Sequence, residues 1–409
     1  MELSPGYKQT EIGVIPDDWD VSLLDSVAKR GTGHTPNKKH PEYWDGQIKW
    51  ISLQDSDRLD RLYISDSTAK ITPEGIANSS AIMHSAGTVV LSRDAGVGKS
   101  AIMKDDMAVS QHFMAWKCGP SLDNHFLYYW LQSNKSEFER IAMGNTIKTI
   151  GLPFFKQFVV PLPTKAEQEA IAEALSDTDA LIESLEQLIA KKHHLKQGAM
   201  QELLTGKKRL QGFSGEWEVK RLGSLAGITR GASPRPIDNP KWFDENSTIG
   251  WVRISDVTKS GMFLRETTQR LSPLGVKSSR PVSRGSLIMS ICATIGRPII
   301  TKIDTCIHDG FVVFDAPCLS QLFLYYALKS IEGDWGKHGQ TGSQMNLNTG
   351  LINRTKISVP KDEAEQTAIA TILSDMDTEI TSLETKLAKT RQLKQGMMHN
   401  LLTGRIRLI

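Results

Sequence analysis

The sequence predicts a mixed α+β fold: two globular α/β domains separated by two long antiparallel coiled-coil helices, as an internal repeat about a pseudo-twofold axis. Three observations lead to this prediction. The chain repeats itself, the most similar part of each copy carries a sustained heptad pattern, and the remaining parts alternate short apolar runs with turn clusters.

The repeat sets the domain organisation. Residues 166–210 align without a gap with residues 364–408, at an offset of 198 residues, and 27 of the 45 positions are identical. The same offset links isolated glycines, prolines and aromatic residues upstream, among them Trp19 with Trp217 and Gly33 with Gly231. Duplicated units of this kind commonly pack about a pseudo-twofold axis. We therefore predict globular domains at residues 1–160 and 211–357, each followed by a helical segment, at residues 161–210 and 358–409.

Apolar residues recur every three or four positions in both helical segments, which is the pattern of a coiled-coil seam. The pattern follows Pro163 or Pro360 and ends at Leu-Leu-Thr-Gly, where Gly206 or Gly404 suits a helix C-cap. A helix over residues 165–204 is roughly 60 Å long, too long to be buried in one small domain. A heptad more often marks ordinary helix core, but here the natural partner of each helix is the other copy, lying antiparallel. The predicted seam consists of Ile171, Leu175, Ile182, Leu185, Ile189, Ile369, Leu373, Met376, Ile380, Leu383 and Leu387.

The variable parts before each helical segment are typical of mixed α/β structure. Short β-rich runs at residues 88–91 and 286–291 alternate with clusters of Gly, Pro, Asn and Asp. The clearest helices are expected at residues 123–141 and 319–331. Gly33, Gly87 and Gly98, with their repeat partners, are expected in turns with unusual backbone angles. Trp19 and Trp217 are expected to close each domain's core near the helix junction.

Composition excludes several classes of protein. An apolar fraction of 39% and a charged fraction of 23% are ordinary for a globular protein, and a net charge of +3 decides nothing about nucleic acid. The four cysteines form no CxxC pair, which argues against structural zinc and favours a reducing cytoplasm. We see no signal peptide and no apolar stretch long enough to span a membrane, so a cytoplasmic location is expected.

Signals of catalysis are incomplete. Gly98-Lys99-Ser100 ends like a phosphate-binding loop, but Arg93 stands where its first glycine is required, and the second copy has Gly296-Arg297-Pro298. Gly31-Thr32-Gly33-His34 is half of a dinucleotide fingerprint and indicates a turn. There is no HExxH spacing and no Asp-Pro-Pro-Tyr or Asn-Pro-Pro-Tyr/Phe sequence. We therefore predict no catalytic residue and no metal site.

Two motifs resemble a known family. The repeated segment ends in Leu-Lys-Gln-Gly followed by Leu-Leu-Thr-Gly, and the chain opens on Tyr-Lys-Gln-Thr-Glu-Ile-Gly-Val-Ile-Pro-Asp-Asp-Trp from Tyr7 to Trp19. Together with the order of two variable parts and two near-identical helices, this resembles the specificity subunit (HsdS) of type I restriction-modification systems. The resemblance spans the whole chain, with its specific motifs in the helices.

The resemblance implies a non-catalytic DNA-binding protein. Each globular part would be a target recognition domain that reads one half of a bipartite, asymmetric double-stranded DNA sequence, and the helices would set the gap between the halves. The helices would also dock two methyltransferase subunits, which methylate adenine with S-adenosylmethionine, and ATP- and Mg-dependent restriction subunits would join them. None of these cofactors would be bound by this chain.

Candidate DNA-binding residues were chosen from Gly/Pro-rich loops and repeat-aligned polar positions, because Arg suits guanine, Asn or Gln suits adenine, and Lys, Ser and Thr suit phosphates. Any one of them is more often an ordinary solvated side chain, so the set carries more weight than its members. Arg93 and Gln344 rank first for substitution. In the first domain the candidates are Arg30, Thr32, His34, Lys38, Arg93, Lys99, Gln111 and Lys148. In the second they are Arg230, Ser233, Arg235, Arg253, Arg297, His308, Gln340 and Gln344.

Two other classes stay open at this point. A coiled-coil adaptor that binds only proteins would show no salt-dependent DNA affinity. A methyltransferase or nuclease with an unrecognised active site would act without partner subunits.

Overall fold

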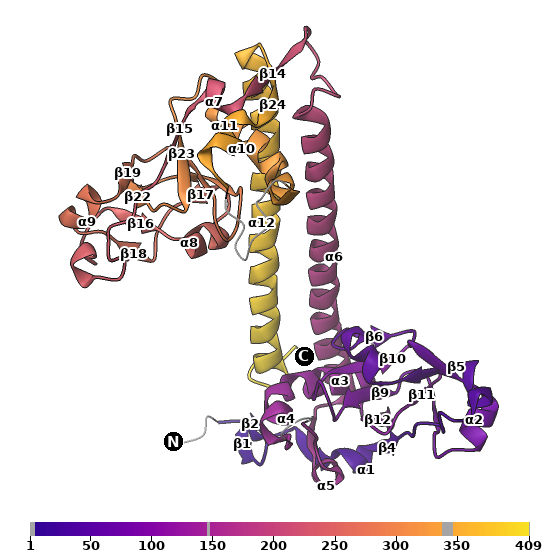
Figure 1. The fold of residues 1–409 in the computed structure, drawn as a ribbon. Helices are drawn as coiled ribbons and strands as arrows, with labels where there is room; N and C mark the ends of the chain where they lie inside the picture. Colours follow the sequence, from indigo (N-terminus) through magenta and orange to yellow (C-terminus); the bar gives the residue numbers. More distant parts are fainter. Residues whose placement is uncertain (1–4, 145–147, 338–346, 409) are drawn as a thin grey trace. The chain divides into compact units, whose positions relative to one another are not determined.

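The computed structural model describes residues 5–144, 148–337 and 347–408. It separates into two compact units, one of residues 1–187 with 384–409 and the other of residues 188–383. Unit 1 holds the first globular domain and unit 2 the second, and each unit also holds part of both long helices (Figure 1).

The two repeated segments form helices of equal length, α6 at Lys165–Leu203 and α12 at Glu363–Leu401. The chain leaves each helix through a glycine in the left-handed region, with φ of +70° at Gly206 and +67° at Gly404. This confirms the predicted C-caps, because only glycine adopts this conformation without steric cost. Among the described residues, no helix is both long and apolar enough to cross a membrane.

Within each unit the two helices run antiparallel. In unit 1, Asp179 contacts Lys394 at 2.6 Å and Glu186 contacts Arg391 at 2.6 Å, so the numbering rises along α6 while it falls along α12. Unit 2 repeats this order. There Lys192 contacts Glu379 at 2.6 Å.

Lys196 also pairs with Asp377 in unit 2. This antiparallel pairing was predicted, and it determines which ends of the two helices meet. Ile171 and Leu175 share a core with Leu401 and Leu402 at the far end of α12, and not with their repeat equivalents.

Each globular domain contains a five-stranded and a four-stranded mixed sheet. In unit 1 the larger sheet has the order β4-β12-β9-β10-β6 and the smaller one β7-β5-β11-β8. The strands of the larger sheet are β4 Ala28–Thr32, β6 Tyr63–Ile64, β9 Val89–Ser92, β10 Ser100–Met103 and β12 Phe113–Cys118. Those of the smaller are β5 Trp44–Ile51, β7 Ala69–Ile71, β8 Met83–His84 and β11 Met107–Val109.

Unit 2 reproduces this topology strand for strand. Its sheets have the orders β15-β23-β20-β21-β17 and β18-β16-β22-β19. The strands of the larger sheet are β15 Gly227–Arg230, β17 Phe263–Leu264, β20 Leu287–Ser290, β21 Pro298–Thr301 and β23 Phe311–Asp315. Those of the smaller are β16 Gly250–Val252, β18 Gln269–Arg270, β19 Arg280–Val282 and β22 Thr305–Ile307.

Short strand pairs complete each unit next to the long helices. In unit 1, β3 pairs with β13, and β1 with β2; in unit 2, β14 pairs with β24. Their bounds are β1 Tyr7–Thr10, β2 Gly13–Pro16, β3 Asp20–Leu23, β13 Val159–Leu162, β14 Trp217–Arg221 and β24 Lys356–Pro360.

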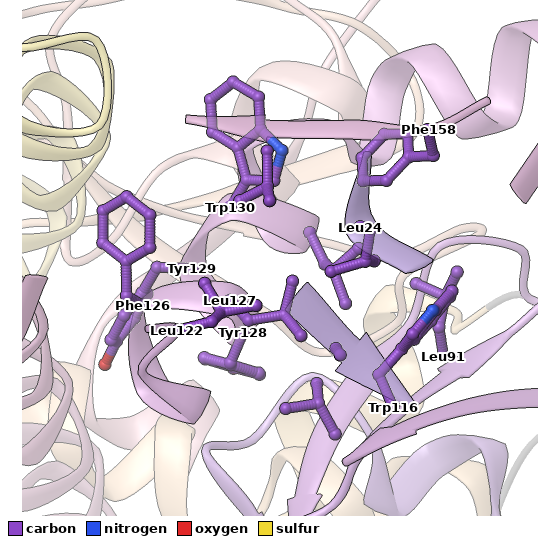
Figure 2. Packing of buried hydrophobic residues seen from close by; sticks show 14 of the residues in the cluster. Leu24, Leu91, Trp116, Leu122, Phe126, Leu127, Tyr128, Tyr129, Trp130 and Phe158 are labelled. Carbon is purple, nitrogen blue, oxygen red and sulfur yellow. The ribbon is translucent and has the colours of Figure 1, made fainter. Parts of the chain in front are cut away.

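The central strand β9 is buried at every position because both faces of the larger sheet are covered. Val89 and Leu91 point into the core formed with the domain's helices, whereas Val90 points into a second core against the smaller sheet. Successive residues of the strand thus enter two different cores, which explains why apolar and polar residues do not alternate along its sequence. Figure 2 shows part of the helix-side core, in which Leu91 and Trp116 of the sheet share one cluster with Phe126, Tyr128, Tyr129 and Trp130 of the helix that follows β12.

The helices that cover this sheet begin at capping residues. The predicted helix at residues 123–141 is two helices, α3 Asn124–Ser133 and α4 Lys135–Ile141, which meet at Asn134. Asp123 caps α3 by accepting from the backbone N–H groups of His125 and Phe126. In unit 2 the predicted helix at 319–331 is α10 Gln321–Ser330. The shorter helices are α1 Leu24–Val27, η1 Pro41–Tyr43, η2 Leu53–Arg58, α2 Pro73–Ala77, α5 Leu152–Lys156, α7 Leu222–Leu225, η3 Pro240–Trp242, α8 Ile254–Lys259, α9 Pro273–Lys277, η4 Glu332–Lys337 and α11 Thr349–Arg354.

An arginine clamp, by which we mean the arginine after each long helix and the buried glutamate it binds, ties that helix end to the start of the other long helix. In unit 1 the guanidinium of Arg407 donates to both oxygens of Glu167 and to both oxygens of Asp18. The fully buried Trp19 also donates to Glu167, at 3.1 Å, which places it at the helix junction as predicted.

In unit 2, Arg209 binds Glu365 through two hydrogen bonds of 2.7 and 2.8 Å. Trp217 packs over Gly206, but its indole N–H has no hydrogen-bond partner among the described residues.

Candidate nucleic-acid interface

Three loops meet at one edge of each globular domain, where the two sheets join. In the first domain they are residues 33–37 after β4, the β9–β10 turn at residues 93–99, and the β11–β12 turn at residues 110–112. In the second they are residues 231–235, 291–297 and 308–310. We call each set the loop edge of its domain.

Backbone contacts hold each loop edge together. In the first domain the N–H of Arg93 donates to the carbonyl of His112 at 3.0 Å, and in the second that of Ile291 donates to Gly310 at 2.8 Å. The first loop packs so closely on the third that a Cβ on Gly33 would lie 1.6 Å from the carbonyl oxygen of Val109. A Cβ on Gly231 would lie 2.1 Å from that of His308.

These approaches correct one expectation. We expected Gly33 and Gly231 to adopt unusual backbone angles, but neither has positive φ; glycine is required there because no side chain fits. Gly87, Gly98, Gly285 and Gly296 do have positive φ, between +77° and +92°.

Side chains at equivalent positions link the first and third loops in both domains. In the first domain the hydroxyl of Thr35 donates to the amide oxygen of Gln111 at 2.7 Å. In the second, Ser233 and Asp309 occupy the same two positions of the repeat, and the hydroxyl of Ser233 donates to the carboxylate at 2.6 Å. The linkage is therefore conserved while its charge changes from neutral to negative.

The two loop edges also differ in the groups around that link. In the first domain His112 contacts Asp94 at 2.6 Å and lies 3.4 Å from the amide nitrogen of Gln111. In the second, Asp309 accepts from Arg235 at 2.9 Å through its side chain and from Arg230 at 2.6 Å through its backbone carbonyl.

Electrostatics differ accordingly. Burial alone would raise the pKa of Asp309, but the hydrogen bond from Ser233 and the charge of Arg235 lower it below its ordinary value of 3.8. Burial lowers the pKa of the neighbouring His308 to about 4. A neutral ring agrees with its geometry, because its Nδ1 accepts from the N–H of Gly310 at 2.8 Å. His308 therefore shapes the turn and carries no charge at neutral pH.

The structure places about half of the predicted DNA-binding residues on the loop edges. These are His34, Arg93, Lys99 and Gln111 in the first domain, and Ser233, Arg235, Arg297 and His308 in the second, with Arg230 and Arg253 beside the latter set. The side chain of Arg93 is half-buried, and its Nε lies 3.6 Å from a carboxylate oxygen of Asp94. This ion pair stabilises the turn.

Other candidates have structural partners away from this link. Lys99 donates to the carbonyl of Ser56 at 3.1 Å, and its repeat equivalent Arg297 donates to that of Ser260 at 3.2 Å. Thr32 donates to the carbonyl of Phe113 at 2.8 Å, and Arg30 pairs with Asp25 at 3.2 Å.

Four candidates remain exposed or outside the described residues. Lys38 is exposed. Lys148 is also exposed, and it lines a shallow hollow of about 320 Å³ with Lys99 and Lys135. Gln340 and Gln344 lie outside the described residues.

Sequence reasoning missed Thr35, His112 and Asp309. The signal was present in the repeat: Ser233 and Gln111 were selected, but their partners at the aligned positions, Thr35 and Asp309, were not. Among the residues that the structure describes, no group of three or more His, Cys, Asp or Glu side chains is arranged to hold a metal ion.

All predicted seam residues on the long helices are buried or half-buried. In unit 1 the seam joins the core of the first domain through Ile171 and Leu175, and in unit 2 that of the second through Ile369 and Leu373.

Comparison with known proteins places this architecture in one family. The family model for the type I restriction modification DNA specificity domain matches residues 16–191 and again residues 214–393. The MjaVIII specificity subunit of Methanocaldococcus jannaschii is 25% identical over 420 residues, which cover 96% of this chain and 94% of that subunit. The MjaIX specificity subunit of the same organism is 28% identical over 270 residues, but this match spans only 62% of this chain and 61% of that subunit.

Solved structures share the fold. The type I restriction-modification S subunit from M. genitalium superposes with a TM-score of 0.60 at 18% identity, covering 98% of this chain and 99% of that one. A chain from a study of assembly and conformational transition in a type I system gives a TM-score of 0.59 at 17% identity, covering 96% and 99%. With two family domains covering most of the sequence and the same architecture throughout, the chain belongs to the DNA specificity subunits of type I restriction-modification systems.

Proposed function

We propose that each loop edge reads one half of a bipartite DNA target, and that the chain contributes sequence recognition without catalysis. The observation that carries this proposal is the pair of equivalent links at the two edges. Their backbone frame is the same, whereas the side chains on it differ in charge and hydrogen-bonding capacity. A protein that reads two different half-sites needs this combination, because the frame sets the docking and the side chains determine the base.

The surrounding cations suit the DNA backbone. Lys99, Lys135 and Lys148 line one hollow in the first domain, and Arg230 flanks the loop edge in the second. Such groups bind phosphates irrespective of sequence and fix the register of the protein on the duplex.

Catalysis would come from partner subunits. We propose that two methyltransferase subunits with S-adenosylmethionine, and restriction subunits with ATP and Mg, assemble with this chain, and that none of these cofactors binds to it. The long helices are the proposed docking surface for the methyltransferase. Family membership supports this assignment.

Salt dependence and methylation together test the proposal. We expect the chain assembled with its methyltransferase to bind duplex DNA with an affinity that falls steeply between 50 and 200 mM salt, since several phosphate contacts release counterions. Sequencing of methylated adenines in cells that express both should show one bipartite motif. Affinity without a salt slope would favour a protein adaptor, and methyl transfer or DNA cleavage by the purified chain alone would favour an enzyme.

A further inference from the structure

The loop edge of the second domain contains a carboxylate where a DNA-binding surface would be expected to avoid one. The side chain of Asp309 is 40% exposed, and a negative charge there repels phosphates. Yet three groups from the facing loop and strand converge on this one residue. Ser233 and Arg235 donate to its side chain, and Arg230 to its backbone carbonyl.

The arginine held by this carboxylate is itself largely exposed to solvent. The side chain of Arg235 is 69% exposed and is fixed at one terminal nitrogen, 2.9 Å from Asp309. A guanidinium has five N–H donors in a rigid fork. Among the described residues, the structure shows no second hydrogen-bond partner for Arg235. The remaining donors are therefore available to an external ligand with two adjacent acceptors.

We propose that Asp309 is a positioning residue that orients Arg235 to recognise a guanine in the half-site read by the second domain. This inference rests on the proposed function. Guanine presents N7 and O6 as two acceptors in the major groove, and a fork held at one end suits them better than a freely rotating chain. Ser233 fixes the other carboxylate oxygen and so defines the direction of the pair.

The first domain has other residues at the positions aligned with Asp309 and Arg235. Asn37 stands in place of Arg235 and Gln111 in place of Asp309, and Thr35 donates to Gln111 at 2.7 Å. Neither of these two aligned positions carries a cation to orient. The proposed arginine–guanine contact is therefore specific to the second domain.

The test uses the full chain with its methyltransferase, and its readout is the base frequency at each position of the methylated motif. Asp309→Asn keeps the size of the side chain and can still accept from Ser233, but it loses the ion pair with Arg235. We expect guanine preference at one position of one half-site to fall about tenfold, within the range for loss of a bidentate base contact. The other half-site should be unchanged.

Arg235→Lys and Arg235→Ala should relax the same position, because lysine keeps the charge but not the fork. Asp309→Asn should have no further effect at that position in the Arg235→Ala background. Asp238→Asn is the matched control: it removes an exposed negative charge in the same region, and it should alter overall affinity without changing base preference. Gln111→Ala should affect only the other half-site.

Several results would overturn the inference. A wild-type half-site without guanine, unchanged guanine preference in Asp309→Asn, or independent effects of Asp309 and Arg235 would each do so. A uniform loss of base preference at every position of the motif would show that Asp309 has only a structural role. If Asp309→Asn fails to fold, Arg235→Lys decides whether this arginine reads the guanine. Asp309→Glu then decides whether a carboxylate at this position supports the guanine preference. If the wild-type complex produces no methylated motif, the proposed function fails instead.

Discussion

In unit 1, Arg407 binds Glu167 and Asp18 beside a hydrogen-bonded Trp19, and in unit 2, Arg209 binds Glu365 beside an unbonded Trp217. These arginine clamps keep the same arginine and glutamate in both copies. The loop edges do not keep the same residues in both copies. The first carries a neutral Thr–Gln link, and the second carries a charged Ser–Asp–Arg cluster. The repeat has thus preserved the groups that tie the end of one long helix to the start of the other, while the groups exposed to a ligand have diverged.

Removing one copy altogether is the most severe test of this comparison. Residues 1–210 lack the end of α12, which leaves the apolar core around Ile171 and Leu175 uncovered. We expect this half to dimerise, because its own helix end carries Gly206 and Arg209, the equivalents of Gly404 and Arg407. With the methyltransferase it should modify a symmetric site. Light scattering measures the dimer, and Arg209→Ala within the half should weaken it. A stable monomer would contradict the exchangeability of the two helix ends.

Breaking each clamp is the next largest effect. Glu365 and Glu167 are each 1% exposed, and removal of the partner of a buried charge costs about 3–5 kcal/mol. We expect Arg209→Ala to destabilise more than Arg407→Ala, because Trp19 still donates to Glu167 whereas Glu365 has no indole bond. Urea unfolding measures both. Lys208→Ala, at a side chain 71% exposed, is the control and should change stability little. If Arg407→Ala were more destabilising than Arg209→Ala, the hydrogen bond from Trp19 to Glu167 would not compensate for the lost arginine.

Acid should affect the second domain through His308. Its pKa is about 4 in the folded state against an ordinary 6.5, so the unfolded chain binds the proton more readily. The stabilisation is complete above pH 6.5 and is lost as the pH falls towards 4, by about 2 to 3 kcal/mol at 1.4 kcal/mol per pKa unit. Comparing urea unfolding of the wild type and His308→Gln at pH 7.5 and 4.5 isolates this group from the carboxylates. Parallel pH dependence in the two proteins would refute the assignment.

The smallest expected effect concerns a glycine inside each long helix. Gly198 in α6 and Gly396 in α12 occupy equivalent positions of the repeat. A Cβ added to either glycine would have no neighbouring atom within 4 Å outside the helix's own backbone. We expect Gly198→Ala or Gly396→Ala to raise the free energy of unfolding by about 0.5–1 kcal/mol, as alanine has the higher helix propensity. Thermal unfolding of the isolated chain measures it, with the close-packed Gly33→Ala as a destabilised counterpart. Destabilisation by either helix variant would contradict the open environment found here.

Much of the frame could be predicted because it depends on periodic patterns. The heptads and the Leu-Leu-Thr-Gly ends located α6 and α12, and apolar runs located β9 and β20, because burial imposes these patterns locally. The partners along the helices were harder. Ile171 packs with Leu401, 230 positions away, and only the antiparallel register determines that.

The loop edges show where sequence reasoning stops. Lys99 and Arg297 stay predicted DNA-binding residues, but the sequence could not show that their side chains also donate to the backbone carbonyls of Ser56 and Ser260, 43 and 37 positions away. Asp309 was overlooked because an acidic residue is a poor candidate by itself. Only the approach of Ser233 and Arg235 in space gives it a role.

The tight approach at Gly33 and Gly231 carries a consequence for engineering. The same main-chain packing brings the first and third loops together in both domains although the side chains that link them differ, so these side chains should be exchangeable without rebuilding the scaffold. Transplanting the second domain's trio into the first would require only Thr35→Ser, Asn37→Arg and Gln111→Asp. New binding preferences could then arise through three point changes on an otherwise untouched protein.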